Sequence, residues 1–390
     1  MESFLGILIP LVFILISGHL IWKSTDGFET AADFLGRRMS HGVKGATINA
    51  VASSMPEFLT TLFFLFSVNN KGEFVDSFSG GLGVVAGSAV FNILVIPLAI
   101  ILFGRIRMKD NLFSLDRKVI MRDGLFLVFA NVIFIFLISR QVIVPMHGLA
   151  LIFIYLVYLF LLRKGFGFDN RVEHNPEDYA IDRVKIVPKH VFLLEIKQLL
   201  LNGKNLNTAN AWVTLLVSTF FMSLGTWLLV KGTELLGDAH YELFGMQLPG
   251  LDLPIVFLSV LLAAAATSIP DTMVSVRDAR KGNHNDSISN AIGSNIFDLS
   301  FALGVPLLIY TMLNGPIEMS YPTRVLSISF WIAMWIVNII IVPVFIFNRK
   351  LNRRTGAILA LLYLFFIFYV IEETAGNGMF KGIAEWVIGI

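Results

Sequence analysis

The sequence contains no cysteine, which excludes disulfide bonds, cysteine-ligated zinc sites and iron–sulfur clusters. Charged residues are also scarce, because Asp, Glu, Lys and Arg make up only 15% of the 390 residues, whereas 56% are hydrophobic. The mean hydropathy of +0.75 is too high for a soluble globular protein. This composition predicts an integral membrane protein that crosses the bilayer several times.

Long apolar runs predict the membrane spans, since about 20 helical residues cross the hydrocarbon core. We expect an all-α polytopic membrane protein with ten transmembrane helices. Their approximate ranges are 4–22, 43–68, 78–103, 123–139, 144–162, 209–230, 252–276, 286–312, 325–347 and 355–371. We expect the first run to be a retained helix, not a secretory signal, because Glu2 makes its start acidic and basic residues follow it.

Basic residues are distributed unevenly between the predicted loops. About 25 of the 30 Lys and Arg residues fall in the loops that follow odd-numbered spans. Cytoplasmic loops carry such an excess, so the long polar loop 163–208 is expected to be cytoplasmic and both termini extracytoplasmic. The predicted location is the cell (inner) membrane. The acidic cluster from Asp169 to Asp182 is expected to be a solvated part of that loop.

Two short motifs each occur twice along the chain, in the same order. Residues 53–57 read Ser-Ser-Met-Pro-Glu and 267–271 read Thr-Ser-Ile-Pro-Asp, while 87–92 read Gly-Ser-Ala-Val-Phe-Asn and 293–298 read Gly-Ser-Asn-Ile-Phe-Asp. All four segments lie within predicted spans. A repeated two-part motif at comparable places in both halves predicts an internal duplication.

The predicted duplication divides the chain into two repeats of five spans. The first covers 1–162 with its motifs at 50–92, and the second covers 209–390 with its motifs at 264–298. Five is an odd number, so the second repeat enters the membrane from the opposite side and the repeats are inverted. The motifs then meet near the midplane from opposite directions.

The motifs place carboxylates and prolines where lipid is expected. A charged residue at the centre of a span costs about 2.5 to 3.5 kcal/mol, and an interior proline costs roughly 3 kcal/mol. Pro56 and Pro270 lack an amide proton, which leaves the carbonyls of Ala52 and Ala266 without their helical partners. Such placements indicate a functional site.

The side chains of the motifs offer oxygen atoms, which hard cations prefer. Hydroxyls precede each acid or amide by three or four residues and therefore share its helix face. The predicted ligands from the residue pattern are Glu57, Asp271, Asp298, Asn92, Ser53, Ser54, Ser88, Thr267, Ser268 and Ser294. Glu57, Asp271 and Asp298 carry three negative charges, which one divalent ion plus a monovalent ion or proton, or three sodium ions, would balance.

These residues resemble the alpha repeats of the cation/calcium exchanger superfamily, and within it most closely the potassium-dependent sodium/calcium exchangers. The resemblance implies that Glu57 and Asp271 are the central calcium ligands and that Asp298 governs a monovalent site. It also implies that the hydroxyls and the carbonyls of Ala50 and Ala264 help to bind sodium. The first and sixth helices are implied as the moving pair of an alternating-access mechanism.

The resulting hypothesis is a secondary antiporter that exchanges Ca²⁺ for Na⁺, with potassium dependence left open. Proton-coupled export of calcium or another divalent ion is the alternative, and a cation channel is the alternative from another class. We expect no enzymatic activity and no cofactor beside the transported ions, which are Ca²⁺, Na⁺ and, if transport depends on potassium, K⁺. The expected partners are inorganic cations and the lipid bilayer, not nucleic acid, and the oligomeric state is left open.

Overall fold

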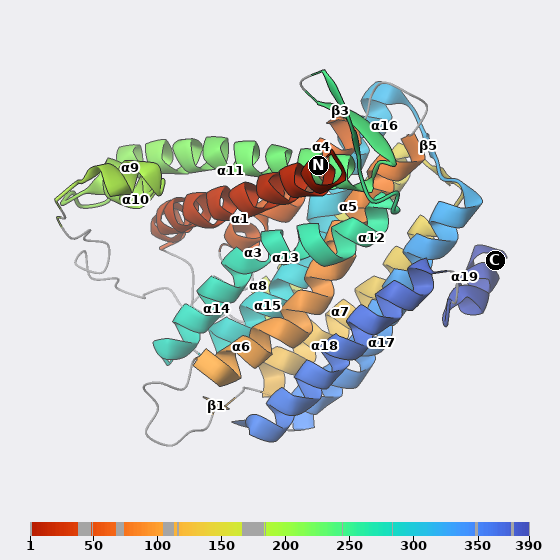
Figure 1. Cartoon of the computed structure of the whole chain (residues 1–390). Coiled ribbons are helices and arrows are strands. Elements are labelled where there is room, and N and C mark those ends of the chain that lie inside the picture. The colour runs from red at the N-terminus through yellow and green to blue at the C-terminus, as the bar shows by residue number, and fades with distance from the viewer. Residues whose placement is uncertain are drawn as a thin grey trace.

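The computed structural model describes residues 2–37, 48, 50–67, 74–103, 113–114, 117–165, 183, 185–243, 245–282, 284–347, 350–375 and 378–389. The first residues of the predicted span 43–68 lie outside the described residues, as do the acidic cluster Asp169–Asp182 and most of the polar loop around it. The described part of the chain is a bundle of helices with three short antiparallel strand pairs (Figure 1).

The helices are α1 (Glu2–Leu35), α3 (Ala50–Ser53), α4 (Met55–Ser67), α5 (Phe74–Val90), α6 (Ile96–Phe103), α7 (Arg117–Ile138), α8 (Pro145–Gly165), α9 (Pro188–Phe192), α10 (Ile196–Leu201), α11 (Thr208–Gly237), α12 (Ile255–Leu258), α13 (Ala264–Thr267), α14 (Ile269–Arg280), α15 (His284–Phe297), α16 (Leu303–Asn314), α17 (Tyr321–Phe347), α18 (Arg353–Thr374) and α19 (Lys381–Gly389). Three π-helical segments are η2 (Phe91–Val95), η5 (Ser259–Ala263) and η6 (Asp298–Ala302). The antiparallel strand pairs are β1 (Phe113–Ser114) with β6 (Lys350–Leu351), β2 (Val142–Ile143) with β5 (Ile317–Glu318), and β3 (His240–Leu243) with β4 (Met246–Pro249).

Eight helical segments in the described residues are long and apolar enough to cross a membrane, and a ninth is present if the bent run α12 to α14 counts as one span. The apolar helix α4 is shorter than a full span. The chain is therefore a helical membrane protein with several spans. The expected total of ten is not reached by this count, because the second predicted span begins in a segment outside the described residues.

The first helix is longer than predicted. α1 continues to Leu35, although the apolar run that predicts it ends near residue 22. Lys23, Asp26 and Glu29 extend the helix beyond that run, and no proline interrupts it between residues 22 and 35. Hydrophobicity marks the part of a helix that lies in lipid, whereas the backbone pattern continues wherever no residue breaks it.

The prolines of the repeated motifs break their helices, as predicted. α3 ends at Ser53 and α4 starts at Met55, immediately before Pro56. In the second half, α13 ends at Thr267 and α14 starts at Ile269, with a bend of 40° at the break. Proline at the second position of a helix has no hydrogen bond to lose, so each break falls just before the proline.

The Gly-Ser-x-x-Phe motifs each run into a π-helical turn. η2 begins at Phe91 and carries Asn92, and η6 begins at Asp298. A π turn inserts one extra residue into the helix and often marks a functional site. In both halves the acid or amide of the motif therefore lies within a locally widened turn.

α5 lies at the centre of the bundle, in a span whose most apolar stretch is 83% buried. It packs against α12 and η5 at very close range, since a Cβ atom added at Gly83 would lie 2.6 Å from the Val256 carbonyl oxygen. A Cβ atom added at Gly87 would overlap the Val260 carbonyl oxygen of η5. α1 packs along α11 at the edge of the bundle, and this pair runs in a different direction from the other long helices (Figure 1).

The close approach at Gly87 gives a first prediction. Gly87→Ala is expected to destabilise the protein by about 1 to 3 kcal/mol, because the methyl group forces α5 away from η5. The measurement is the thermal unfolding of the purified protein in detergent. Gly382→Ala is the matched control, since nothing lies within 4 Å of a Cβ atom there. Equal unfolding temperatures for Gly87→Ala and the unmodified protein would contradict the packing described.

Candidate cation-binding site

The repeated motifs meet at the centre of the bundle. α3 contacts α15, α13 contacts α5, and α4 contacts η6, so elements from the two halves of the sequence alternate around one point. All twelve residues predicted as ligands lie there, and none is more than 1% exposed. The structure therefore brings these residues together, while their role as cation ligands stays a prediction.

The Ser88 hydroxyl takes part in four hydrogen bonds of the site. Its oxygen lies within donor distance of two carboxylates, at 3.1 Å from Oε1 of Glu57 and 3.4 Å from Oδ2 of Asp298. It accepts from the Ser268 hydroxyl at 3.0 Å and, at the long distance of 3.5 Å, from the Asn92 amide. One small side chain on α5 thus contacts groups from both halves of the chain.

Asp271 has a second group of partners. The Ser294 hydroxyl donates to its Oδ1 at 3.0 Å, and the Ser53 hydroxyl and Asn92 amide also interact with this carboxylate. Thr267 interacts with Glu57 in the same manner as Ser53 does with Asp271. Each carboxylate of the proline motifs therefore has one hydroxyl partner from its own half and one from the other half.

Asp298 completes the set of carboxylates. Ser88 is its hydroxyl partner, the Ser54 hydroxyl lies near it, and the charges of Asp298 and Asp271 both act on Glu57. These three carboxylates repel one another, because they are buried together and like charges are poorly screened in a low-dielectric interior.

Several oxygen atoms of the site have no hydrogen-bond partner. Among the described residues, they are Oε2 of Glu57, Oδ2 of Asp271, Oδ1 of Asp298, Oδ1 of Asn92 and Oγ of Ser54. A buried polar atom without a partner costs about 1 to 3 kcal/mol, and more when it is charged. In the described residues, no three His, Asp or Glu side chains converge on a single point as a metal-binding group. The site offers carboxylate, hydroxyl and amide oxygens together, and these are the ligands that hard cations prefer.

The two alanine carbonyls named as sodium ligands have hydrogen bonds of their own. The Ala50 oxygen accepts from the Ser54 amide at 2.9 Å and the Ser53 hydroxyl at 3.4 Å. The Ala264 oxygen accepts from the Ser268 amide at 3.0 Å and the Thr267 hydroxyl at 3.2 Å. A carbonyl oxygen has two lone pairs, so these contacts narrow the space left for an ion at Ala50 and Ala264.

Several polar residues beside the site were not among the predicted ligands. Asn295 donates from its amide to the Ala89 carbonyl at 2.9 Å and so joins α15 to α5. Ser275 on α14 and Asn290 on α15 are fully buried and contact each other. The sequence carries a signal for this pair, because Ser275 follows Asp271 by four residues and Asn290 precedes Ser294 by four.

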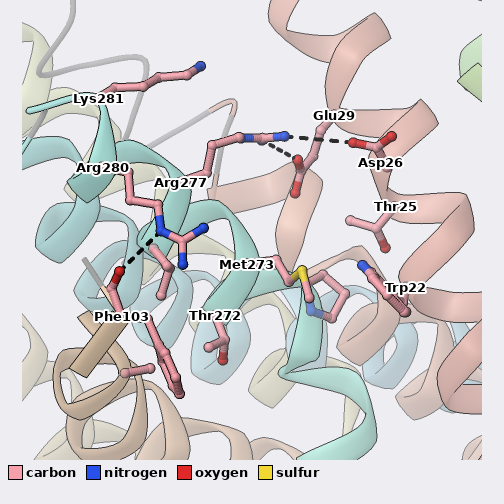
Figure 2. A pocket seen from close by; sticks show the side chains of 13 residues that line it. Trp22, Thr25, Asp26, Glu29, Phe103, Thr272, Met273, Arg277, Arg280 and Lys281 are labelled. Carbon is pink, nitrogen blue, oxygen red and sulfur yellow. Dashed lines mark hydrogen bonds and ion pairs between the residues drawn. The ribbon is translucent and has the colours of Figure 1, made fainter. Parts of the chain in front are cut away.

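A cavity of about 610 Å³ lies on the other side of α14, between α14, α1 and α6. Pro270 lines it, so the cavity reaches the residue next to Asp271. The Arg277 guanidinium bridges to α1, with 2.6 Å to Oε2 of Glu29 and 3.7 Å to Oδ1 of Asp26, and Arg280 donates to the Phe103 carbonyl at 3.1 Å (Figure 2). Charged pairs thus tie the long first helix to the broken helix of the site.

Comparison with known protein families identifies the class of this fold and site. A family model described as "Sodium/calcium exchanger protein" matches residues 9–164 and 210–372. The matched segments make up most of the sequence. The chain belongs to the sodium/calcium exchanger family.

The most similar curated relatives include human sodium/potassium/calcium exchanger 5, which is 36% identical over 163 residues, or 39% of this chain and 29% of that protein. The sodium/potassium/calcium exchanger Nckx30C of Drosophila melanogaster is 31% identical over 156 residues, or 40% of this chain and 16% of that protein. The aligned part of the chain thus spans less than a third of the length of these relatives.

Two solved structures share the fold over nearly the whole chain. The sodium-calcium exchanger NCX_Mj, soaked with Na⁺ and Sr²⁺, aligns with a TM-score of 0.54 at 21% identity and covers 91% of this chain and 96% of that one. The H⁺/Ca²⁺ exchanger CAX aligns with a TM-score of 0.54 at 16% identity and covers 100% of this chain and 92% of that one. At these identities the likeness concerns the fold alone.

The unpartnered carboxylate oxygens give a second prediction. Ca²⁺ is expected to raise the unfolding temperature of the purified protein, because a ligand at 100 times its Kd stabilises the folded state by about 2.7 kcal/mol. Asp271→Asn is expected to abolish the rise, and Glu318→Gln, which changes an exposed carboxylate on β5, is expected to retain it. A full calcium effect in Asp271→Asn would remove Asp271 from the ligands.

Proposed function

We propose that the chain is a secondary antiporter that exchanges Ca²⁺ for Na⁺ through the central site by alternating access. The observation that carries the proposal is the set of three fully buried carboxylates whose free oxygens lie among hydroxyl and amide groups. Membership of the sodium/calcium exchanger family supports the same cargo. The proposed ligands are the twelve residues of the sequence analysis.

Charge balance explains why the two cargoes exchange. Within the described residues, the hydrogen-bond partners of Glu57, Asp271 and Asp298 include no cationic side chain, so their charge is balanced by ions or protons. A divalent cation neutralises two charges, and sodium ions neutralise one each. Both loads use the same carboxylates, so binding of one opposes binding of the other and an ion gradient of one drives the other.

The proposed coupling ion is Na⁺ because hydroxyls outnumber carboxylates around the site. A proton needs only a carboxylate, whereas a dehydrated Na⁺ needs several neutral oxygens as well. The difference between Asn92 and Asp298 at matching positions of the two motifs gives the second half one additional charge. We assign this charge at Asp298 to a monovalent ion, which is K⁺ if the chain shares the cargo named for its curated relatives.

The proposed architecture is ten spans in two inverted repeats, with α3 and α4 forming the second span and α12 to α14 the seventh. Three matched features support it: a helix broken before a proline, a Gly-Ser-x-x-Phe motif, and a π turn after that motif in each half. Two hydroxyl contacts support it too. Ser53 of the first half contacts Asp271 of the second, and Thr267, at the position that matches Ser53, contacts Glu57, at the position that matches Asp271.

The proposed moving pair is α1 and α11. These helices pack through glycines, since a Cβ atom added at Gly225 would lie 3.2 Å from the Ile21 amide and one at Gly232 would lie 3.0 Å from the Pro10 carbonyl. A smooth contact of this kind keeps the two helices together while the pair slides as a unit across the central site. Small residues at helix interfaces in membranes allow such close approach.

The third prediction is the transport reaction. Proteoliposomes loaded with Na⁺ are expected to accumulate radiolabelled Ca²⁺ when diluted into sodium-free medium. Asp271→Asn is expected to lower the uptake rate by at least about tenfold, which corresponds to an increase of about 1.4 kcal/mol in the activation free energy. External K⁺ and pH are varied independently. Uptake that depends on K⁺ in the original protein but not in Asp298→Asn would place K⁺ at Asp298.

Two results of the uptake experiment would contradict the proposal. Uptake driven only by a proton gradient would replace Na⁺ by H⁺ as the coupling ion and make the proton-coupled alternative the better description. Uptake that follows the calcium gradient without any counter-ion would indicate a channel. The control variant is Glu318→Gln, which is expected to transport at the rate of the original protein.

The fourth prediction concerns orientation, which we propose has both termini outside and 163–208 in the cytoplasm. The chain has no cysteine, so a single introduced cysteine is its sole thiol. Met379→Cys, at an exposed position after α18, is expected to react with an impermeant thiol reagent in intact cells. Lys204→Cys, exposed before α11, is expected to react only after permeabilisation. The reverse pattern would invert the orientation.

A further inference from the structure

A ladder of polar side chains leads away from Asp271 between α14 and α15. On α14, Ser275 and Asp278 follow Asp271 by four and seven residues and so lie on the same helix face. On α15, Asn290 and Ser287 precede Ser294 by four and seven residues. Both helix faces extend toward the end of α14 that we propose is cytoplasmic.

Three hydrogen bonds join the two helix faces. Beyond the bond from Ser294 to Asp271, the Asn290 amide donates to the Ser275 hydroxyl at 3.2 Å, and the Ser287 hydroxyl donates to the Ser275 carbonyl at 2.6 Å. Ser275, Ser287 and Asn290 are fully buried, and Asp278 is 9% exposed. The Oδ1 atom of Asn290 is buried without a hydrogen-bond partner.

The corresponding faces of the first half are largely apolar. The motif register matches Glu57 with Asp271 and Ser88 with Ser294, so Thr61 and Phe64 correspond to Ser275 and Asp278, and Val84 corresponds to Asn290. Close contacts fill this region: a Cβ atom added at Gly81 would lie 3.1 Å from Cγ2 of Thr61, and one added at Gly80 would lie 2.6 Å from the Phe64 ring.

The comparison between the halves shows whether packing of the two helices requires polar residues at these positions. In α4 and α5, Phe64, Val84 and Gly81 stand at three of the four matching positions and only Thr61 is polar, so the fold itself does not require an amide or a carboxylate there. The second half instead buries an amide, two hydroxyls and a carboxylate there, and leaves one amide oxygen without a donor. A buried amide oxygen without a donor costs free energy unless something binds it.

We infer that the ladder between α14 and α15 holds a further cation site, distinct from the central site, that binds Na⁺ on its way to or from the cytoplasm. The ligands are Oδ1 of Asn290, the Ser275 hydroxyl and the Asp278 carboxylate. One carboxylate with neutral oxygens matches a cation of single charge. The assignment of Na⁺ and of the cytoplasmic side rests on the proposed function and orientation.

The site makes the two faces of the transporter unequal. A Na⁺ ion that arrives from the cytoplasm meets a carboxylate, an amide oxygen and a hydroxyl one to two helical turns before the central carboxylates, whereas the matching external region offers Phe64, Val84 and the single hydroxyl of Thr61. Removing the ladder site therefore weakens the apparent affinity for Na⁺ on the cytoplasmic face and leaves the external face unchanged.

Asn290→Val tests the inference, because valine is the residue at the matching position of the first half. In oriented vesicles, the Na⁺ concentration for half-maximal exchange at the cytoplasmic face is expected to rise about fivefold, which is about 1 kcal/mol, and the external value is expected to stay within about twofold. Thr272→Val is the matched control, since the Thr272 hydroxyl donates to the Ser268 carbonyl one helical turn earlier, at 2.9 Å. Equal shifts at both faces, or none, would overturn the inference.

Binding measured without transport separates this site from the proposed function. Purified protein is titrated with radiolabelled Na⁺ at equilibrium in detergent, and Asn290→Val is expected to bind one Na⁺ fewer per chain than the original protein. Ser275→Thr, which keeps the hydroxyl, is expected to retain that ion even if Asn290→Val folds poorly. If Na⁺ fails to drive calcium uptake yet this ion is bound and lost as described, the exchange proposal fails and the ladder site stands. Unchanged binding in a folded Asn290→Val, or loss of the ion in a folded Ser275→Thr, would refute the site.

Discussion

The main constraint on the structure is the mutual repulsion of three buried carboxylates that have no cationic partner among the described residues. Glu57, Asp271 and Asp298 are all inaccessible to solvent, and their hydrogen-bond partners are serines, one threonine and one asparagine. A salt bridge to lysine or arginine would remove the repulsion, but it would also remove the need for an ion. The broken helices, the π turns and the close glycine contacts around α5 all serve to bring neutral oxygens within reach of these charges.

The centre of the molecule was more predictable from the sequence than its edges. Hydroxyls three and four residues before an acid must share its helix face, so Ser53, Ser294 and their counterparts could be identified from residue spacing alone. The break before each proline followed from the missing amide proton in the same way. The meeting of the two motifs was expected from the predicted inverted duplication, since copies that enter a membrane from opposite sides would share its middle.

Other features were not predicted from the sequence. The hydrophobic run ends near residue 22, but α1 continues to Leu35 because helical hydrogen bonding does not depend on hydrophobicity. The pairing of Ser275 with Asn290 depends on two helices facing each other, which helical spacing alone does not specify. The hydrogen bonds made by the Ala50 and Ala264 carbonyls depend on the path of the backbone around the helix breaks. The number of spans among the described residues depends on whether the bent run α12 to α14 is counted as one span.

The position of Ser88 between two carboxylates has a consequence for how ions communicate. A hydroxyl has a single proton, and Ser88 lies within donor distance of both Glu57 and Asp298. In the proposed function, a cation bound to Glu57 would repel this proton and turn it toward Asp298, where the proton would oppose a second cation, and a cation at Asp298 would do the reverse. The free energy of each binding event then depends on the other by the same amount, because such coupling is reciprocal. In the proposed function, one rotating hydroxyl would thereby couple the two ion positions so that each binding event opposes the other, without any movement of the backbone.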